Sequence, residues 1–143
     1  MEVENPGEQL LKSYNVSVGR IQGVNLPIES IGVITHLVHQ DPRIVCAGIF
    51  GSRADENAEV TDSSDIDLGI VVDDYDQDKI AGIDFNISRK YRQITGDETE
   101  VHVCSLNKGV NHSADEKNVD AEFRDIALEQ MVVLKGSMTD FEH

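Results

Sequence analysis

Two apolar runs that lie close together in the chain constrain its fold more than any other feature. Residues 43–50 (RIVCAGIF) are almost entirely apolar, and residues 64–72 (SDIDLGIVV) carry apolar side chains at alternate positions. An unbroken apolar run is typical of a strand that is buried on both faces, and alternation is typical of a strand with one face in the core. Because Gly51-Ser52 follows the first run directly, we expect two neighbouring strands joined by a short helix and a loop.

Helical periodicity surrounds these two strands. Apolar residues recur every three or four positions in residues 27–40 and 78–94, and a further helix is expected at residues 119–130. Additional strands are expected at residues 98–106 and 131–134. The alternation of strands and helices predicts an α/β (α+β) fold, with a small mixed β-sheet flanked by helices.

The length of 143 residues suits one domain. We expect the domain proper at residues 25–136, followed by a short polar tail at 137–143. Residues 1–24 show only loose apolar alternation, interrupted by Gly19 and Gly23. They are consistent with a short hairpin or with an arm that docks on a partner, and the sequence does not decide between the two.

The charge of the chain limits its partners. Twelve Lys and Arg residues face 27 Asp and Glu residues, which gives a formal net charge of -15. Nucleic acids are bound by neutralising their phosphates with Lys and Arg, so no nucleic-acid partner is expected. The densest basic cluster, Arg89, Lys90 and Arg92, fits the solvated face of a helix. The acidity suits a high-salt cytoplasm and an ordinary acidic bacterial protein equally well.

Several features point to a cytoplasmic protein without a membrane span. Cys46 and Cys104 each lie in an apolar stretch and are expected to be small buried hydrophobic residues, without a disulfide or a zinc site. No stretch approaches the length of about 18 apolar residues that a membrane span needs, and Met1–Asn5 lacks the features of a signal peptide. His36 and His39, one turn apart on a helix, are expected to be packing or surface residues.

The segment from Phe50 to Leu68 carries the residues suited to catalysis. Asp65 and Asp67 are two positions apart in a predicted strand, so their carboxylates point to the same face. Mg²⁺ takes one or two carboxylates together with substrate phosphate oxygens. Gly51 would let the backbone approach those phosphates, and a helix that begins at Ser52 would direct N–H groups toward them. Taken singly, Gly-Ser is more often a turn and Asp-x-Asp an exposed edge, but together and in this order they favour a phosphate-handling site.

This segment resembles the signature of the polymerase-beta-like nucleotidyltransferase superfamily, in which Gly-Ser, a linker and Asp-x-Asp follow one another; the layout of the whole domain is similar as well. The resemblance implies that Gly51 and Ser52 hold the triphosphate of a nucleoside triphosphate such as ATP, and that Asp65 and Asp67 bind two Mg²⁺ ions. The linker here is longer than in the commonest members, which leaves a lid role for residues 55–62 open.

The same resemblance implies a third carboxylate on a later strand. Glu98 and Glu100 are the candidates, and both share a strand face with His102. We favour Glu100 as a metal ligand and as the acceptor of the substrate proton, although family members often carry Asp here. Arg53 either reaches the triphosphate or forms a surface salt bridge, and Ser64 either contacts the nucleotide or caps a turn.

Within the superfamily, the chain is similar to minimal nucleotidyltransferases encoded beside helical HEPN-type ribonucleases. That resemblance implies an antitoxin that transfers AMP onto a tyrosine of its partner toxin. The chain has no Arg-x4–6-His ribonuclease motif and no helical domain to hold an acceptor, so a partner protein or a second copy is expected to supply the acceptor site. Transfer to a small molecule such as an aminoglycoside, and a non-catalytic nucleotide-binding module that blocks a partner by contact, remain alternatives. The sequence does not identify the acceptor or the base of the nucleotide.

Overall fold

The two apolar runs form the centre of a four-stranded sheet. In the computed structural model, which describes residues 6–55, 64–107 and 117–142, β1 (Ile44–Phe50) pairs with β2 (Ile66–Val72) in the antiparallel direction. β3 (Val101–Ser105) pairs with β2 in the parallel direction, and β4 (Val132–Lys135) pairs with β1 in the antiparallel direction. The strand order is β3-β2-β1-β4. The expected small mixed sheet is therefore confirmed.

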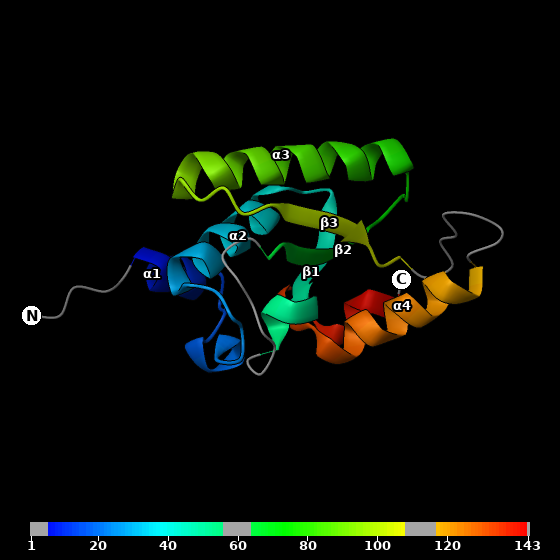
Figure 1. Cartoon of the computed structure of the whole chain (residues 1–143), viewed down its shortest axis with the longest axis horizontal. Coiled ribbons are helices and arrows are strands. Elements are labelled where there is room, and N and C mark those ends of the chain that lie inside the picture. Colours follow the sequence, from blue (N-terminus) through cyan, green and yellow to red (C-terminus); the bar gives the residue numbers. More distant parts are fainter. Residues whose placement is uncertain (1–5, 56–63, 108–116, 143) are drawn as a thin grey trace, which may run out of the picture.

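Helices cover both faces of this sheet (Figure 1). On one face lie α1 (Pro6–Ser13), α2 (Ile28–Gln40) and α3 (Gln77–Thr95), whose apolar side chains join the main core. On the other face, α4 (Lys117–Gln130) and the 3-10 helix η3 (Met138–Glu142) cover a smaller core around Phe50, Val71 and Leu106. Successive residues of β1 join different cores, Ile49 the larger and Phe50 the smaller, because neighbouring side chains of a strand point to opposite faces.

The N-terminal segment contains helices, and the hairpin, one of the two alternatives left open for it, does not form in the described residues 6–24. Residues 6–13 form α1, and a 3-10 helix η1 follows at Val18–Ile21. Leu11 is completely buried in the main core. Two glycines allow α1 to approach α2 closely: a Cβ atom on Gly7 would lie 2.6 Å from Glu29 Cα, and one on Gly32 would lie 2.6 Å from the Gly7 carbonyl oxygen.

The C-terminal segment also packs against the domain rather than extending from it as a polar tail. Phe141 is only 1% exposed and belongs to the smaller core. Arg124 in α4 donates hydrogen bonds to the carbonyl oxygens of Leu106 (2.8 Å) and Phe141. One guanidinium therefore joins the end of β3 to the C-terminal 3-10 helix.

Side chains complete the hydrogen bonding where regular elements end. Lys135 Nζ lies within hydrogen-bond distance of the carbonyl oxygens of Val38, Asp41 and Ile44, at 3.2, 3.3 and 2.6 Å. The last carbonyls of a helix have no partner within it, so a cation there satisfies them and complements the helix dipole. The side-chain amide of Asn107 accepts a hydrogen bond from the N–H of Val72 and donates one to its carbonyl oxygen. This side chain therefore takes the place of a backbone neighbour at the end of β2.

Cys46 is buried, Cys104 is half-buried, and both are free thiols. Burial raises the pKa of Cys46 to about 12 and that of Cys104 to about 11. In the part of the chain that the structure describes, no helix combines the length and the apolar character needed to cross a membrane.

Candidate active site

The turn that follows β1 brings backbone close to a carboxylate. Gly51 opens the 3-10 helix η2 (Gly51–Ala54) with a φ of +74°, and a Cβ atom here would lie 2.5 Å from Oδ2 of Asp67. Only glycine suits both the positive φ and the contact. The next residue, Ser52, is exposed. The expected short helix after the first strand is therefore present, directly beside one of the two candidate aspartates.

The two aspartates share one face at the start of β2. Ile66 and Leu68 are completely buried in the main core, so Asp65 and Asp67 project from the opposite face. Asp65 is 47% exposed and Asp67 is half-buried. Burial raises the pKa of Asp67; the charge of His102 opposes this shift, and that of Asp65 adds to it. The pair therefore presents one solvated and one partly desolvated carboxylate.

The parallel neighbour β3 contributes the next two groups. The N–H of Ile66 donates to the carbonyl oxygen of Glu100 at 2.9 Å, and Asp67 is in register with His102. His102 Nε2 lies 3.1 Å from Oδ2 of Asp65 and 3.4 Å from Oε2 of Glu100. All three side chains are about half exposed. Strand pairing, rather than sequence proximity, therefore assembles this group of side chains.

Asp65, Glu100 and His102 each offer a ligand atom within 4.8 Å of the others, and this is the only such group among the described residues. The carboxylates suit a hard divalent cation such as Mg²⁺. Of the predicted metal ligands, Asp65 and Glu100 belong to this group, with His102 as a nitrogen donor, whereas Asp67, on the same face of β2, is not part of it. Glu98, the other candidate for the third carboxylate, lies outside this group.

A turn before β3 fixes the approach to Glu100. Oδ1 of Asp97 accepts hydrogen bonds from the N–H and the hydroxyl of Thr99, at 2.9 and 2.7 Å. The hydroxyl of Tyr91 donates to Asp97 Oδ2 at 3.1 Å. These bonds to Thr99 lower the pKa of Asp97, with a further contribution from the charge of Arg53. Asp97 was not among the predicted site residues; its local signal in the sequence is the Asp-x-Thr spacing, which is typical of a side-chain-capped turn.

Arg53 is a buried residue of the turn that follows β1. Its side chain is only 8% exposed, so a surface salt bridge is wrong. The guanidinium donates to the carbonyl oxygens of Asn25 (3.1 Å) and Ser64 (2.8 Å), and the N–H of Asn25 donates to the carbonyl oxygen of Arg53 at 2.6 Å. Arg53 therefore ties the Gly-Ser turn to the residue that precedes Asp65. Residues 56–63, which include most of the segment considered as a lid, lie outside the described residues.

His36 and His39 are remote from this group and pack as expected. His39 stacks on Tyr14 with ring centroids 4.3 Å apart, and His36 Nδ1 lies 2.8 Å from the Tyr14 hydroxyl oxygen. His39 Nε2 lies 3.0 Å from the carbonyl oxygen of Leu134. Burial lowers the pKa of His39. These contacts fix α1 against α2 and β4.

Comparison with known protein families assigns the chain to one of them. The family model described as "Polymerase beta, Nucleotidyltransferase" matches residues 33–119. The chain belongs to this nucleotidyltransferase family. The match includes the Gly-Ser turn, both aspartates and β3, so the predicted site residues all lie within the matched range. Family membership supports nucleotidyl transfer as the class of activity.

A solved structure shows the same fold. One chain of a crystal structure of a mutant MntA-HpeT toxin–antitoxin complex matches with a TM-score of 0.53 and 16% sequence identity. The match covers 78% of the present nucleotidyltransferase chain and 77% of the solved one. No curated protein sequence matches the chain significantly.

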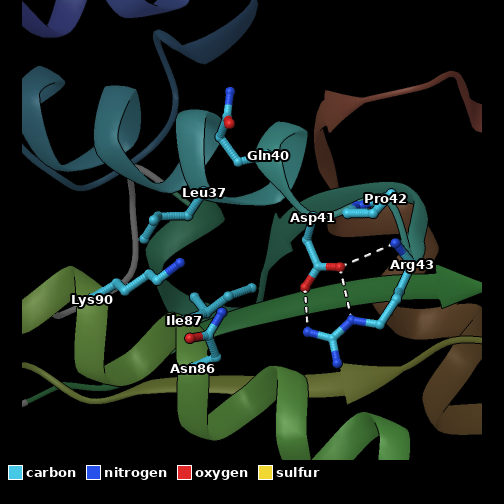
Figure 2. Close-up of a pocket in the computed structure, with 8 residues that line it drawn as sticks. All are labelled: Leu37, Gln40, Asp41, Pro42, Arg43, Asn86, Ile87 and Lys90. Atoms are coloured by element: carbon cyan, nitrogen blue, oxygen red, sulfur yellow. Dashed lines mark hydrogen bonds and ion pairs between the residues drawn. The ribbon is translucent and has the colours of Figure 1, made fainter.

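A separate pocket of about 210 Å³ lies between α2 and α3 (Figure 2). One side is formed by Asp41, whose carboxylate accepts hydrogen bonds from the backbone N–H, Nε and a terminal nitrogen of Arg43 at 3.0, 2.9 and 2.7 Å. Lys90 and Asn86 of α3 line the other side. None of the candidate active-site residues lines this pocket.

Proposed function

We propose that the protein is a cytoplasmic, metal-dependent nucleotidyltransferase that transfers AMP from ATP to a hydroxyl group on a partner protein and thereby acts as an antitoxin. The observation that carries the proposal is the register of the sheet. It places Asp67 beside Gly51 and Asp65 beside Glu100 and His102, within a matched nucleotidyltransferase domain.

In this proposal the residues of the site have separate tasks. The backbone of Gly51 and Ser52 binds the triphosphate, and Asp65, Asp67 and Glu100 hold two divalent cations, for which the family resemblance implies Mg²⁺. Bound cations neutralise charge on the attacking and leaving oxygens of such a displacement. Glu100 accepts the proton of the acceptor hydroxyl, whose oxygen forms a bond to the α-phosphorus. The bond from this phosphorus to the bridging oxygen breaks, and pyrophosphate leaves.

The nature of the partner is inferred from the fold comparison and the sequence resemblance. The similar solved chain belongs to a toxin–antitoxin complex, and the sequence resembles minimal nucleotidyltransferases that accompany HEPN-type toxins. A docked protein would fix the acceptor hydroxyl beside Glu100. Fixing two reactants in this way lowers the activation barrier by up to about 7–11 kcal/mol.

The direct test combines the protein, α-labelled ATP and the helical protein encoded beside it, with the label mapped by mass spectrometry. We expect AMP on a hydroxyl side chain of the partner. Asp65→Asn and Asp67→Asn should abolish labelling without unfolding the protein, because both carboxylates lie outside the main core. Glu98→Gln is the matched control, since Glu98 is exposed in the same segment and lies outside the carboxylate–histidine group.

Two results would contradict the proposal. Labelling by the doubly substituted protein would remove the aspartates from the mechanism. An unlabelled partner together with rapid modification of an aminoglycoside would replace the protein acceptor with a small molecule. Calorimetry adds an independent check: the carboxylates repel a triphosphate, so ATP should bind much more tightly with Mg²⁺ than without it, and equal affinities would be inconsistent with a metal site.

A further inference from the structure

We propose that His102 supplies a nitrogen ligand to the cation site of this protein, which therefore prefers a first-row transition-metal ion such as Mn²⁺ to Mg²⁺. The inference rests on the proposed function in one respect only, namely that the carboxylate face of the sheet binds a divalent cation. It concerns the identity of that cation and the residue that selects it.

The strand register places His102 among the carboxylates. It is the parallel neighbour of Asp67 and lies two positions after Glu100 on the same face of β3. Asp84 and Ser88 from α3 bond to the backbone of the same strand, at Val103 and Val101. The imidazole is half exposed, so water and metal ions have access to it. The histidine is therefore held at the carboxylate face by its strand and is not part of either core.

The distances fit shared coordination. Adjacent ligands of an octahedral ion with bonds of about 2.1 Å lie about 3 Å apart. His102 Nε2 is 3.1 Å from Oδ2 of Asp65 and 3.4 Å from Oε2 of Glu100. His102 Nε2 thus has the spacing of an adjacent ligand from one oxygen of each carboxylate, and the three ligand atoms all lie within 4.8 Å of one another.

The donor set decides which ion is favoured. Mg²⁺ prefers oxygen ligands and keeps several waters. Imidazole nitrogen favours transition-metal ions. Mn²⁺ accepts carboxylate oxygen and imidazole nitrogen in one octahedral site, so it gains a bond from His102 that Mg²⁺ uses poorly. The selectivity therefore arises from a single side chain on β3.

An opposite role for the same contacts is a protonated His102 that occupies the position of a cation between the two carboxylates. In that case, removing the imidazole would strengthen the binding of every divalent ion. The two roles predict changes of opposite sign, so one substitution distinguishes them.

The test is the binding of metal ions alone, without nucleotide. Mn²⁺ binding is measured from the electron paramagnetic resonance signal of the free ion, with Mg²⁺ as competitor. We expect Mn²⁺ to bind about tenfold or more tightly than Mg²⁺, and His102→Ala to weaken Mn²⁺ binding by a similar factor with little change for Mg²⁺. His102→Asp, which offers oxygen in place of nitrogen, should move the preference toward Mg²⁺. His36→Ala is the matched control, because His36 lies in α2 on the other face of the sheet.

Pulsed resonance spectra give a second readout that a structural role of His102 would not affect. Mn²⁺ bound to the wild-type protein should show coupling to a directly bonded nitrogen, which should vanish in His102→Ala and persist in His36→Ala. Equal affinities for the two ions, tighter binding after His102→Ala, absence of Mn²⁺ binding or absence of nitrogen coupling would each overturn the inference. Nitrogen coupling without AMP transfer would refute the proposed function alone, and transfer supported by a purely oxygen-ligated ion would refute the inference alone.

Discussion

At the scale of single residues, Gly51 couples backbone geometry to the chemistry of the site. Its φ of +74° is unfavourable for other residues, and the missing Cβ atom leaves room for Oδ2 of Asp67. Gly96 provides a natural comparison, since it ends α3 with a φ of +71° and, apart from its chain neighbours, no residue comes within 4 Å of the corresponding Cβ position. The two glycines share a backbone conformation, and only one of them adjoins a candidate ligand.

We predict that Gly51→Ala and Gly96→Ala each destabilise the fold by about 1–2 kcal/mol, the usual cost of left-handed backbone for a residue with Cβ. Only Gly51→Ala should also displace Asp67 and weaken metal-dependent ATP binding. Urea unfolding measures the first effect and calorimetry the second. Unchanged ATP binding in a folded Gly51→Ala protein would show that the close approach to Asp67 has no role in the site.

Asp97 gives a residue-level prediction of pH dependence. Its hydrogen bonds from Thr99 lower its pKa below the ordinary value of 3.8. A carboxyl group with a lowered pKa in the folded state stabilises the protein above its unfolded pKa, and this contribution is lost as the pH falls through the folded value. Asp97→Asn keeps an oxygen acceptor and removes the charge.

The Asp97→Asn protein should therefore unfold at lower urea concentration than the wild type near neutral pH, and the difference should shrink at about pH 3. Glu98→Gln, at the exposed neighbouring position, is the control for loss of one negative charge. A difference between Asp97→Asn and wild type that stays constant across this range would exclude the ionised carboxylate as its cause.

At the scale of secondary-structure elements, α3 satisfies the outer edge of β3. The N–H of Val103 donates to Asp84 Oδ1 at 2.9 Å, and the hydroxyl of Ser88 donates to the carbonyl oxygen of Val101 at 2.7 Å. Unpaired edge groups attract other strands, and this edge belongs to the strand that carries His102. The helix therefore both covers the edge and fixes the position of a candidate metal ligand.

We predict that Asp84→Leu destabilises the protein by about 1–3 kcal/mol, because it leaves the N–H of Val103 without its acceptor. Asp84→Asn retains an oxygen at that position and should remain close to the wild type. Urea unfolding and hydrogen exchange at Val103 measure these effects. Slow exchange at Val103 in Asp84→Leu would mean that another group, and not Asp84, protects this edge.

The elements that periodicity predicted are those with a continuous apolar face of their own. The expected helix at residues 27–40 forms at Ile28–Gln40, and the one at 78–94 forms at Gln77–Thr95. The expected strand at 98–106 is shorter, at Val101–Ser105, because Asp97 and Thr99 form a side-chain-capped turn before it. Ile94, the last apolar residue of the predicted helix at 78–94, is 57% exposed, since it lies in the last turn.

Long-range contacts could not be predicted from local pattern. Arg53 is buried because Asn25 and Ser64 supply carbonyl oxygens from distant parts of the chain. The helix at residues 6–13 has only 8 residues, too few for a periodic pattern to reveal it, and it packs on α2 through the close approach of Gly7 to Gly32. The two aspartates could be placed on one face from their spacing, whereas the contact of Asp65 with His102 depends on a parallel pairing that only the fold establishes.

At the scale of the whole molecule, the dominant property is the formal net charge of -15 on 143 residues. Much of this charge is exposed, as at Asp73 and Asp74 after β2. Charges of one sign repel one another more strongly in the compact state than in the unfolded chain. Salt screens such repulsion, largely removing it between exposed charges more than about 10 Å apart at 0.1 M ionic strength. The stability of this protein should therefore depend on salt more than that of a nearly neutral domain of the same size.

We predict that raising the KCl concentration from about 0.01 M to about 1 M increases the melting temperature by at least ~3 °C, which corresponds to about 1 kcal/mol for a domain of this size. Circular dichroism during heating measures the shift. The double variant Asp73→Asn/Asp74→Asn tests the cause, because it removes two exposed negative charges outside both cores and should show a smaller increase with salt. A melting temperature that falls with KCl would mean that attractive ion pairs outweigh repulsion. An equal salt response in the double variant would place the repulsion elsewhere, with the carboxylates of the candidate active site as the next group to substitute.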